Sequence, residues 1–337
     1  MNPFRQKIRF GIIGTNVITD RFLAGAGLCP EFELTAVYSR TFERGKAFAD
    51  KYGVSLVFTG FEAMAEVIDA VYIASPNSCH CSQALFFLDR GIHVLCEKPL
   101  ASNYEEASRM VEAARRNKVV LMEAMVTTLH PNFRRLKENL SKAGKIRKYF
   151  SSYCQYSSRY DKYKRGILEN AFRPEFSNGA LMDIGIYTIY PMVALFGKPE
   201  SVKAMGCLLE SGVDGEGTVL FEYTGGMHAT VIYSKISSSY LGTEVQGEAG
   251  TLCLDKINTP GRLVFRRTDG GEEDLTAECG GDNYFYEAKA FIELILAGKT
   301  EHALNSHCNS LTVMEIMDEI RSQIGLSYPA DTPPGRF

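Results

Sequence analysis

KIRFGIIGTNVIT, residues 7–19, is the stretch that decides the fold. A short apolar run leads into a glycine turn, and the turn leads into residues with helical spacing. At such a strand–turn–helix junction, backbone N–H groups and the helix dipole can face a pyrophosphate. Counted from Gly14, the dinucleotide-binding pattern G-x-G-x-x-G has Asn16 and Thr19 in place of its second and third glycines.

The turn can tolerate the loss of these glycines, because Asn adopts a positive φ more readily than other residues that carry a Cβ. We therefore expect the phosphates of a dinucleotide to lie against a loop made of Gly14, Thr15, Asn16, Val17 and Ile18. The motif alone leaves a purely structural turn open as the alternative.

Strand-like and helix-like segments alternate from this loop to about residue 125. Short runs rich in Val, Ile, Leu and Tyr predict strands over residues 7–14, 33–39, 69–75, 93–97 and 119–124, with a weaker one at 55–58. Helical spacing predicts helices over residues 18–28, 43–52, 78–90 and 104–117. Such alternation predicts an α/β Rossmann domain, a doubly wound parallel sheet, over residues 1–125.

The pattern changes after residue 126 and predicts an α+β domain with a large, mostly antiparallel open sheet over residues 126–337. Its predicted strands cover 146–157, 201–210, 217–223, 227–234, 242–247, 251–254 and 263–267. Its predicted helices cover 132–142, 179–196, 284–297 and 310–324. Gly225-Gly226 and Gly270-Gly271 are hairpin or turn signals. Whether the helix over 310–324 packs back on the first domain stays open.

Composition and charge exclude several classes of protein. A net charge of −3 argues against binding to a nucleic-acid backbone. The N-terminal apolar run is short and interrupted by Arg9, unlike a signal peptide, and we find no run close to the roughly 20 apolar residues that span a bilayer. We therefore expect a cytoplasmic protein with no membrane partner.

The nine cysteines are scattered through apolar runs, as reduced thiols in a protein core are. Cys79-His80-Cys81 is the one cluster, and no second pair with metal-site spacing follows it. We predict no metal site, and the role of this cluster stays open.

Ser39-Arg40-Thr41 ends the second predicted strand, where an NAD site places an acidic residue for the ribose hydroxyls. A guanidinium and two hydroxyls suit the 2′-phosphate of NADP instead. Ser39 and Arg40 therefore favour NADP, with NAD as the alternative. A solvated arginine at a strand–helix turn is the structural explanation of the same residues.

Two further strand ends carry polar residues at the carboxyl edge of the predicted sheet. The fourth strand ends in Ala74-Ser75-Pro76-Asn77 and the fifth in Cys96-Glu97-Lys98-Pro99. Pro99 ends its strand and would hold Lys98 at the cleft. As an alternative, Glu97 and Lys98 could be no more than a surface ion pair, which would add little to stability. At this edge, however, ligand binding is the more informative interpretation. The candidate cofactor residues here are Ser75, Pro76, Asn77, Glu97 and Lys98.

The second domain contains GALMDIGIY, residues 179–187, in which Asp183 and Tyr187 share one face of a helix. Gly185 between them would let a flat ring approach. Taken alone, a helix N-terminal Asp and a core Tyr explain the segment better.

Taken together, these segments resemble the glucose–fructose oxidoreductase / inositol dehydrogenase (Gfo/Idh/MocA) family of sugar and polyol dehydrogenases, over essentially the whole chain. The resemblance rests on GIIGTNVI (11–18), SPNSCHCSQA (75–84), CEKPLA (96–101), NGALMDIGIY (178–187) and SLTVMEIMDEIRSQIGLSYP (310–329). It implies a Rossmann domain and a substrate domain whose open sheet commonly serves for dimerisation. It also implies that Lys98 is the catalytic lysine, that Asp183 lies in the substrate site, and that residue 187 exchanges a proton with substrate.

Many members of the family carry D-x-G-x-H, whereas Tyr187 resembles the branch with glucose–fructose oxidoreductase and dimeric dihydrodiol dehydrogenase. MEAMVTTLHP, residues 122–131, is also similar to the dihydrodiol dehydrogenases, although Val126 stands where they would have tryptophan, which puts the pocket shape in question. His80, Glu123 and Arg173 complete the implied cofactor-side set, although residues such as His80 and Arg173 are more often structural.

The chemistry implied by the resemblance is coherent. The pKa of a phenol is about 10, and a nearby ammonium such as Lys98 would lower it. Tyr187 would then act as general acid or base, Lys98 would polarise the substrate oxygen, and Asp183 would orient the substrate or tune the pair. The expected protein is an NAD(P)-dependent oxidoreductase acting on a sugar, polyol or cyclic diol or ketone, as a homodimer or dimer of dimers. The alternative is a non-catalytic dinucleotide-binding sensor or regulatory subunit, which would have no need of Lys98, Asp183 and Tyr187 together.

Overall fold

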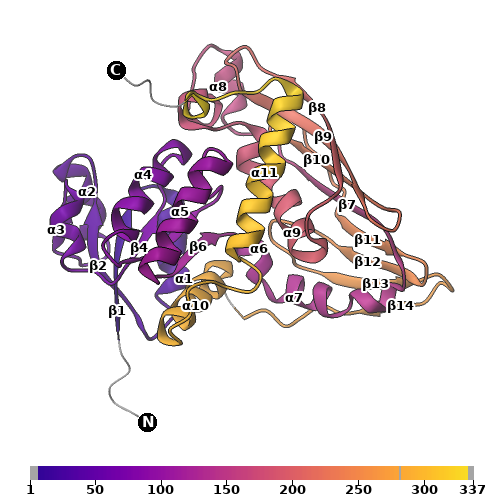
Figure 1. Cartoon of the computed structure of the whole chain (residues 1–337), viewed down its shortest axis with the longest axis horizontal. Coiled ribbons are helices and arrows are strands. Elements are labelled where there is room, and N and C mark those ends of the chain that lie inside the picture. Colours follow the sequence, from indigo (N-terminus) through magenta and orange to yellow (C-terminus); the bar gives the residue numbers. More distant parts are fainter. Residues whose placement is uncertain (1–6, 281, 333–337) are drawn as a thin grey trace, which may run out of the picture. The chain divides into compact units, whose positions relative to one another are not determined.

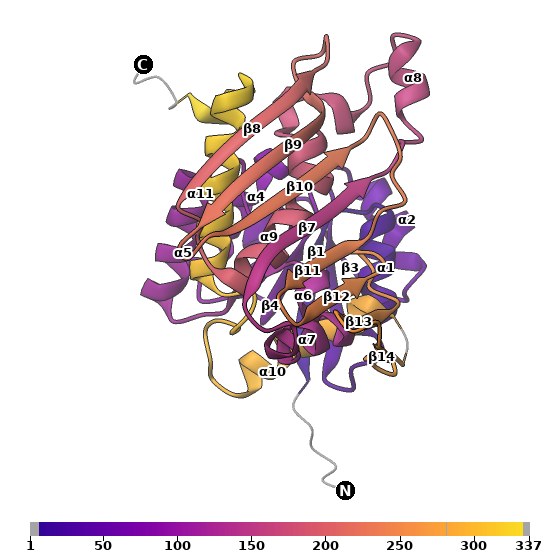
Figure 2. The same ribbon diagram turned by 90° about the vertical axis from the view of Figure 1, so that its right-hand side faces the viewer.

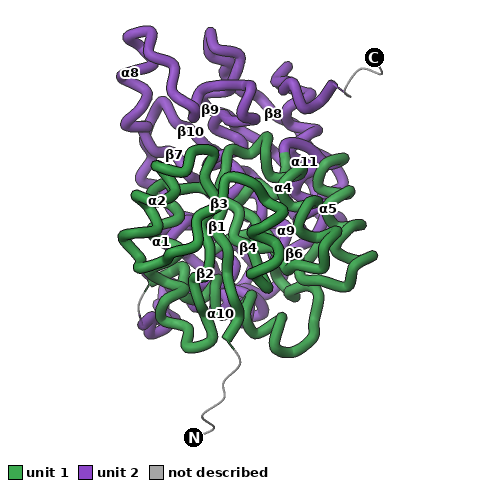
Figure 3. The backbone as a smooth tube through the Cα atoms, turned by 90° about the vertical axis from the view of Figure 1, so that its left-hand side faces the viewer, with its two compact units in different colours: residues 1–101, 105–126, 281–307 green, residues 102–104, 127–280, 308–337 purple. Residues whose placement is uncertain are grey.

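The structure, a computed structural model, describes residues 7–280 and 282–332. The chain forms two compact units (Figure 3). Unit 1 consists of residues 1–101, 105–126 and 281–307, and unit 2 of residues 102–104, 127–280 and 308–337. Residues 281–307, which the sequence analysis placed after the second sheet, therefore complete unit 1.

Unit 1 is built on a six-stranded sheet with the order β3-β2-β1-β4-β5-β6, and every neighbouring pair is parallel. Four of the strands, β1, β4, β5 and β6, are almost fully buried, as their apolar runs predict, whereas β2 and β3 are more exposed. They are β1 (Ile8–Ile13), β2 (Phe32–Tyr38), β3 (Leu56–Phe58), β4 (Ala70–Ile73), β5 (His93–Glu97) and β6 (Leu121–Ala124). The doubly wound Rossmann sheet is confirmed.

The helices of unit 1 flank this sheet (Figure 1). They are α1 (Val17–Ala26), α2 (Phe42–Asp50), α3 (Phe61–Ala65), α4 (Asn77–Leu88), α5 (Tyr104–Asn117) and α10 (Asn283–Leu296). Helix α10 returns from far along the chain and packs on α1. A Cβ at Gly25 would lie 2.5 Å from the backbone N of Phe285, so only glycine permits this approach. Phe291 of α10 also meets the ring of Phe10 in β1, with the centroids 5.9 Å apart.

Unit 2 is built on an eight-stranded sheet with the order β14-β13-β12-β11-β7-β10-β9-β8. Only β7 and β10 pair in parallel; the other neighbours are antiparallel, which confirms the predicted, mostly antiparallel sheet. The strands are β7 (Ile146–Cys154), β8 (Ser201–Leu208), β9 (Asp214–Tyr223), β10 (Met227–Ser234), β11 (Thr243–Gly247), β12 (Gly250–Leu254), β13 (Leu263–Arg267) and β14 (Glu272–Asp274). Gly225 and Gly226, at φ of 82° and 80°, form the β9–β10 turn.

The helices of unit 2 lie mainly on one face of this sheet, and Figure 2 shows the opposite face with its strands in view. Strand β9 alternates buried and exposed residues, as a sheet covered on one face requires. The helices are α6 (Val126–Leu129), α7 (Pro131–Glu138), α8 (Tyr160–Lys164), α9 (Ile186–Phe196) and α11 (His307–Ile324). Short 3₁₀ turns cover Leu140–Ala143, Asn170–Phe172, Pro174–Phe176 and Pro329–Asp331.

Both ends of the large sheet are held by side chains. At β8, Gln323 of α11 donates from Nε2 to the carbonyl of Val202 (2.8 Å) and accepts from the N–H of Ala204 (2.7 Å). These bonds occupy an edge that could otherwise pair with another strand.

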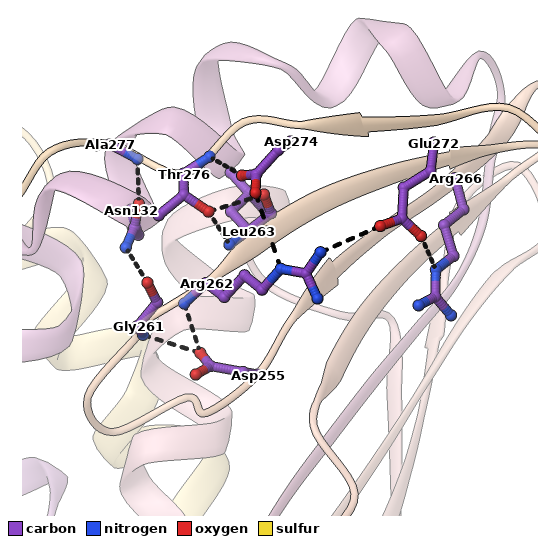
Figure 4. Close-up of polar contacts among 10 residues, drawn as sticks. All are labelled: Asn132, Asp255, Gly261, Arg262, Leu263, Arg266, Glu272, Asp274, Thr276 and Ala277. Atoms are coloured by element: carbon purple, nitrogen blue, oxygen red, sulfur yellow. Dashed lines mark hydrogen bonds and ion pairs between the residues drawn. The ribbon is translucent and has the colours of Figure 1, made fainter.

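At the other end, Asn132 of α7 donates to the carbonyl of Gly261 (3.2 Å) and accepts from the N–H of Ala277 (2.6 Å), as Figure 4 shows. In the same cluster the Asp255 carboxylate accepts from the N–H groups of Gly261 (2.8 Å) and Arg262 (3.0 Å). The buried amide of Asn132 thus joins α7 to the loops on both sides of β13 and β14.

The sequence analysis missed the short elements α3, α6, α8 and β14, because three to five residues give too little periodicity. The helix predicted over residues 179–196 is also not uniform: it begins as a π-helical turn, Leu181–Gly185, and continues as α9 with Pro191 inside it. Proline lacks the N–H of a regular helical bond, and π turns insert one extra residue per turn.

One expectation about apolar runs is wrong. The segment Pro174–Phe196, 23 residues long, is apolar enough to span a membrane by length and composition, with a mean hydropathy of 1.5 in its best window. In the structure 78% of that window is buried inside the protein, as in the core helix of a globular domain.

Candidate functional site

The carboxyl ends of the unit 1 strands bring the predicted cofactor residues of this unit to one edge of the sheet. Strands β1 and β4 are neighbours at the centre, and the chain order reverses between them. Such a switch point is where dinucleotides bind in doubly wound sheets. The loops after β1, β2, β4 and β5 contain Gly14–Ile18, Ser39–Arg40, Ser75–Asn77 and Glu97–Lys98 in turn.

The loop after β1 is not held by the backbone conformation that was expected at Asn16. Gly14 has φ of 106°, and a Cβ there would lie 2.4 Å from the carbonyl O of Ala74, so glycine is required. Asn16, however, has φ of −112°, and the expectation that it replaces a glycine by adopting a positive φ is wrong.

Asn16 caps helix α1 instead. Its Oδ1 accepts from the N–H groups of Ile18 (3.0 Å) and Thr19 (3.3 Å), and its Nδ2 donates to the carbonyl of Ala74 (2.9 Å). Thr19 is fully buried, and its hydroxyl donates to the carbonyl of Gly14 (2.9 Å). The two substituted positions thus hold the turn together by side-chain hydrogen bonds.

Two arginines lie at the end of β2, only one of which the sequence analysis singled out. Arg40 is exposed after the buried Ser39. Arg44, in the first turn of α2, reaches back so that its Nε donates to the hydroxyl of Thr15 (2.9 Å). The signal that could have found Arg44 is its position in the first turn of α2, directly after the Ser39-Arg40-Thr41 strand end.

The loop after β4 is tied to the loop after β5 by His80. This side chain is fully buried, with Nδ1 2.9 Å from the carbonyl O of Pro99 and Nε2 3.0 Å from that of Ser75. Burial lowers the pKa of the imidazole. A neutral ring has one N–H, so one of these contacts is a hydrogen bond at a time. His80 therefore has a structural role, and its direct contact with the cofactor stays a prediction.

The structural alternative, in which Glu97 and Lys98 form only a surface ion pair, does not describe Glu97. It is buried, and its carboxylate accepts from the hydroxyl of Tyr72 (2.6 Å) and from the N–H of Lys98 (3.2 Å). Lys98 itself is partly exposed, between buried neighbours on both sides. Glu123 is buried nearby on β6 and accepts from the N–H of Leu100 (2.9 Å).

Glu287 of α10 is a second buried carboxyl beside Glu97. It is fully buried, and neither carboxyl oxygen has a hydrogen-bond partner among the described residues. Burial, together with the charge of Glu97, raises the pKa of Glu287 well above its usual range. The sequence analysis missed Glu287 because α10 returns to unit 1 from outside the Rossmann segment.

In unit 2, the π-helical turn and α9 display Asp183 and Tyr187 together. Between residues 179 and 194 every side chain is buried except these two. Gly185 between them faces a flat ring, as expected, but that ring is Tyr233 of β10, 3.1 Å from where a Cβ would stand. The glycine thus lets the helical segment pack closely on its sheet.

Two residues that the sequence analysis missed contact this pair. The Lys235 ammonium donates to Oδ2 of Asp183 at 2.7 Å. The ring of Tyr153, in β7, meets that of Tyr187 edge to face, with centroids 5.6 Å apart. Neither is visible in the sequence, because strand register brings both to the site. Arg173 also belongs to unit 2, and its Nε donates to the carbonyl of Leu168 (3.1 Å), so its cofactor contact stays a prediction.

Cys79, His80 and Cys81 do not converge. Cys81 is buried with its thiol near the carbonyl of Glu106 (3.6 Å), and burial raises its pKa to about 11. Within residues 7–280 and 282–332, no three His, Cys, Asp or Glu side chains gather as metal ligands would.

The comparisons with known proteins agree with this architecture. A family model for an oxidoreductase family with an NAD-binding Rossmann fold, GFO_IDH_MocA, matches residues 8–125, and a GFO/IDH/MocA C-terminal domain matches residues 133–253. The chain is 52% identical to scyllo-inositol 2-dehydrogenase (NADP(+)) IolU of Bacillus subtilis, over 96% of this chain and 99% of that protein. It is 30% identical to trans-1,2-dihydrobenzene-1,2-diol dehydrogenase of Mus musculus, over 96% and 99% respectively.

Among solved structures, KijD10, a 3-ketoreductase of Actinomadura kijaniata in complex with NADP and TDP-benzene, matches with a TM-score of 0.82 and 26% identity, over 95% of this chain and 98% of that one. The chain belongs to the Gfo/Idh/MocA family of oxidoreductases. The family and the enzyme class expected from the sequence are confirmed, and the protein is an NAD(P)-dependent oxidoreductase.

Proposed function

We propose that this enzyme transfers hydride between NADP and a secondary alcohol carbon of a cyclic polyol, related sugar or cyclic diol. The observation that carries the proposal is that Asp183 and Tyr187 are partly exposed on an otherwise buried segment. A carboxylate and a phenol that stay partly accessible on such a segment are typical of a site that handles a hydroxyl substrate. The 52% identity to an inositol dehydrogenase makes scyllo-inositol the first substrate to test.

The residues of unit 1 fit a dinucleotide. The positive φ of Gly14 and the absence of a Cβ let the loop after β1 lie against the carbonyl of Ala74, and the N–H groups of Ile18 and Thr19 already serve Asn16. We therefore assign phosphate binding mainly to the backbone amides around Asn16 and Val17, which precede Ile18 and Thr19 in the chain. Arg40 and Arg44 suit a 2′-phosphate, in agreement with the NADP named for IolU and KijD10.

When bound, NADP⁺ supplies the acceptor for the hydride that leaves the substrate carbon. Tyr187 accepts the proton of the substrate hydroxyl in oxidation and returns it in reduction. Lys98 stabilises the negative charge that develops on the substrate oxygen. Asp183 orients the hydroxyl for this transfer. In this proposal the domain expected over residues 1–125 binds the dinucleotide and the domain expected over residues 126–337 binds the substrate. A cytoplasmic location stays a prediction.

Steady-state kinetics of two variants test the assignment. We expect Lys98→Met and Tyr187→Phe each to lower kcat by about 10²- to 10⁴-fold, while the Kd for NADPH changes little, because each change removes proton transfer or charge stabilisation and not cofactor contacts. Tyr240→Phe, at a side chain that is 99% exposed, and Lys198→Met, at a surface ion pair, serve as controls. Turnover close to that of the wild type in either active-site variant refutes the roles assigned.

The alternative, a non-catalytic sensor or regulatory subunit, predicts a different result in binding and activity assays. A sensor would bind NADPH stoichiometrically and show no turnover on any sugar, polyol or dihydrodiol. The family and the dehydrogenase relatives favour the enzyme.

A further inference from the structure

Lys235 is a buried lysine outside the residues considered so far for catalysis. It directly follows β10 and is 3% exposed. Its N–H donates to the carbonyl of Gly215 (2.8 Å), and its carbonyl accepts from the N–H of Ser157 (2.8 Å). Hydrogen bonds thus fix both the N–H and the carbonyl of Lys235, so the backbone that carries its side chain is held in place.

The ammonium lies among groups that compensate its burial. Its Nζ donates to Oδ2 of Asp183 at 2.7 Å and stands 5.3 Å from the centre of the Phe172 ring. The Lys235 side chain is 4% exposed, whereas that of Asp183 is 40% exposed. The lysine therefore holds the carboxylate from the interior, and the carboxylate remains open toward solvent.

A second carboxylate, Asp214, fixes the segment that carries Asp183. It is fully buried, and its oxygens accept from the N–H groups of Ala180 (2.9 Å) and Leu181 (2.7 Å), at the start of the π-helical turn. Burial raises the pKa of Asp214 to about 6, against the opposing effects of these N–H groups and of the charge of Lys235. Lys235 thus pairs directly with the carboxylate displayed by the turn, and its charge also acts on the carboxylate that positions the turn.

We propose that Lys235 is a positioning residue, which acts on the reaction through Asp183. This inference rests on the proposed function, because it gives Asp183 a substrate to orient. An ammonium is expensive to bury, and its ion pair with Asp183 offsets part of that cost while fixing the position of the carboxylate. Loss of the ammonium leaves Asp183 without its interior donor, so that the carboxylate turns away from the orientation that the substrate requires.

A purely structural role for Lys235 makes a different prediction. If the ammonium served only to offset Asp214, its loss would lower stability but leave turnover per folded molecule unchanged. If it positions Asp183, turnover falls in molecules that are folded and bind cofactor, and the loss depends on Asp183 being present.

The test is a double-mutant cycle in kcat/KM for NADP⁺-dependent oxidation of scyllo-inositol by the full chain. We expect Lys235→Met and Lys235→Gln to lower kcat/KM by about 10- to 100-fold with the NADPH Kd unchanged, because misplacement of a substrate-orienting group costs this much. Lys235→Arg should recover most of the loss, since its guanidinium can still donate to the carboxylate. In an Asp183→Asn background, Lys235→Gln should have almost no further effect.

Lys198→Met is the matched control, because Lys198 pairs with Glu315 at 2.5 Å on the surface of the same unit. If Lys235→Gln and Lys235→Arg both turn over like the wild type, or if the losses at positions 183 and 235 simply multiply, the inference is wrong. Lys235→Gln covers the case in which Lys235→Met does not fold, since the amide can still satisfy the buried site.

The proposed function fails separately. Absence of turnover in the wild-type protein on every polyol, sugar and dihydrodiol offered refutes the function and the inference together. Turnover that depends on Lys98 and Tyr187 but not on Lys235 refutes the inference alone.

Discussion

Four side chains shape the carboxyl edge of the unit 1 sheet, where we propose that the cofactor binds. Asn16 and Thr19 replace glycines of the dinucleotide pattern and hold the same turn by capping α1 and by bonding the carbonyl of Gly14. Arg40 and Arg44 supply positive charge at the end of β2, and the contact of Arg44 with Thr15 joins that charge to the phosphate loop. We therefore expect cofactor choice to depend on a few exposed side chains at this edge of the sheet.

Replacement of the two arginines should change cofactor preference. In Arg40→Asp and Arg44→Ala we expect the Kd for NADPH to rise more than that for NADH, because only NADPH carries the 2′-phosphate. The effect should be larger for Arg40→Asp, which also introduces a repelling charge. Fluorescence titration with both cofactors measures it, and equal losses for NADPH and NADH would show that these arginines do not bind the phosphate.

Replacement of Glu287 by glutamine should stabilise the protein above acidic pH. The raised pKa means that the folded state keeps a proton that the unfolded state releases, so stability falls as pH rises above the usual glutamate range. Glu287→Gln cannot lose a proton and escapes this loss. We expect its unfolding midpoint to exceed that of the wild type by at least about 2 °C at pH 8, with the gap closing toward pH 4. A gap that widens toward pH 4 would contradict the buried, protonated carboxyl.

At the scale of elements, the return of α10 to the Rossmann sheet depends on the close approach at Gly25. Gly25→Ala should destabilise unit 1 by about 1–3 kcal/mol, since a Cβ would overlap the backbone of Phe285, which a rotamer change cannot relieve. Thermal unfolding measures the loss, with the exposed Ala24→Ser as control. An unchanged midpoint would show that α10 does not pack at this position.

The long, periodic elements were predictable from the sequence, and candidate residues could be singled out by a strand end or by helical spacing, while their roles stay predictions. Lys98 follows β5 and is signalled by Pro99, and Asp183 and Tyr187 are four residues apart. Lys235, Tyr153 and Glu287 were not predictable, because each reaches its partner through strand register or through the return of a distant helix. The π-helical turn was also missed, since the same apolar spacing fits a regular helix.

For the whole molecule, we expect one face of the large sheet to contact a second copy. Leu220 is 53% and Met205 79% exposed on β9 and β8, and the half-buried Ile232 and Phe150 lie on the same face of β10 and β7. Large apolar side chains on such a face are candidates for burial in an interface. The homodimer or dimer of dimers expected from the family resemblance stays a prediction.

Charge on this face should dissociate the assembly. We expect the wild-type protein to sediment as a dimer or tetramer and Leu220→Glu/Ile232→Glu to shift toward smaller species, because four carboxylates per dimer would be forced into an apolar contact. Analytical ultracentrifugation distinguishes these states. An unchanged distribution in the double variant would exclude this face as the interface.

Deuterium transfer tests the central claim most directly. C–D-labelled scyllo-inositol, with other labelled cyclic polyols and dihydrodiols in parallel, is incubated with NADP⁺ and enzyme, and the reduced cofactor is analysed by mass spectrometry. The account predicts NADPH that carries one deuterium from the substrate carbon, formed by the wild type and lost in Tyr187→Phe. No labelled NADPH from any of these substrates, or equal labelling by the Tyr187→Phe variant, would contradict it.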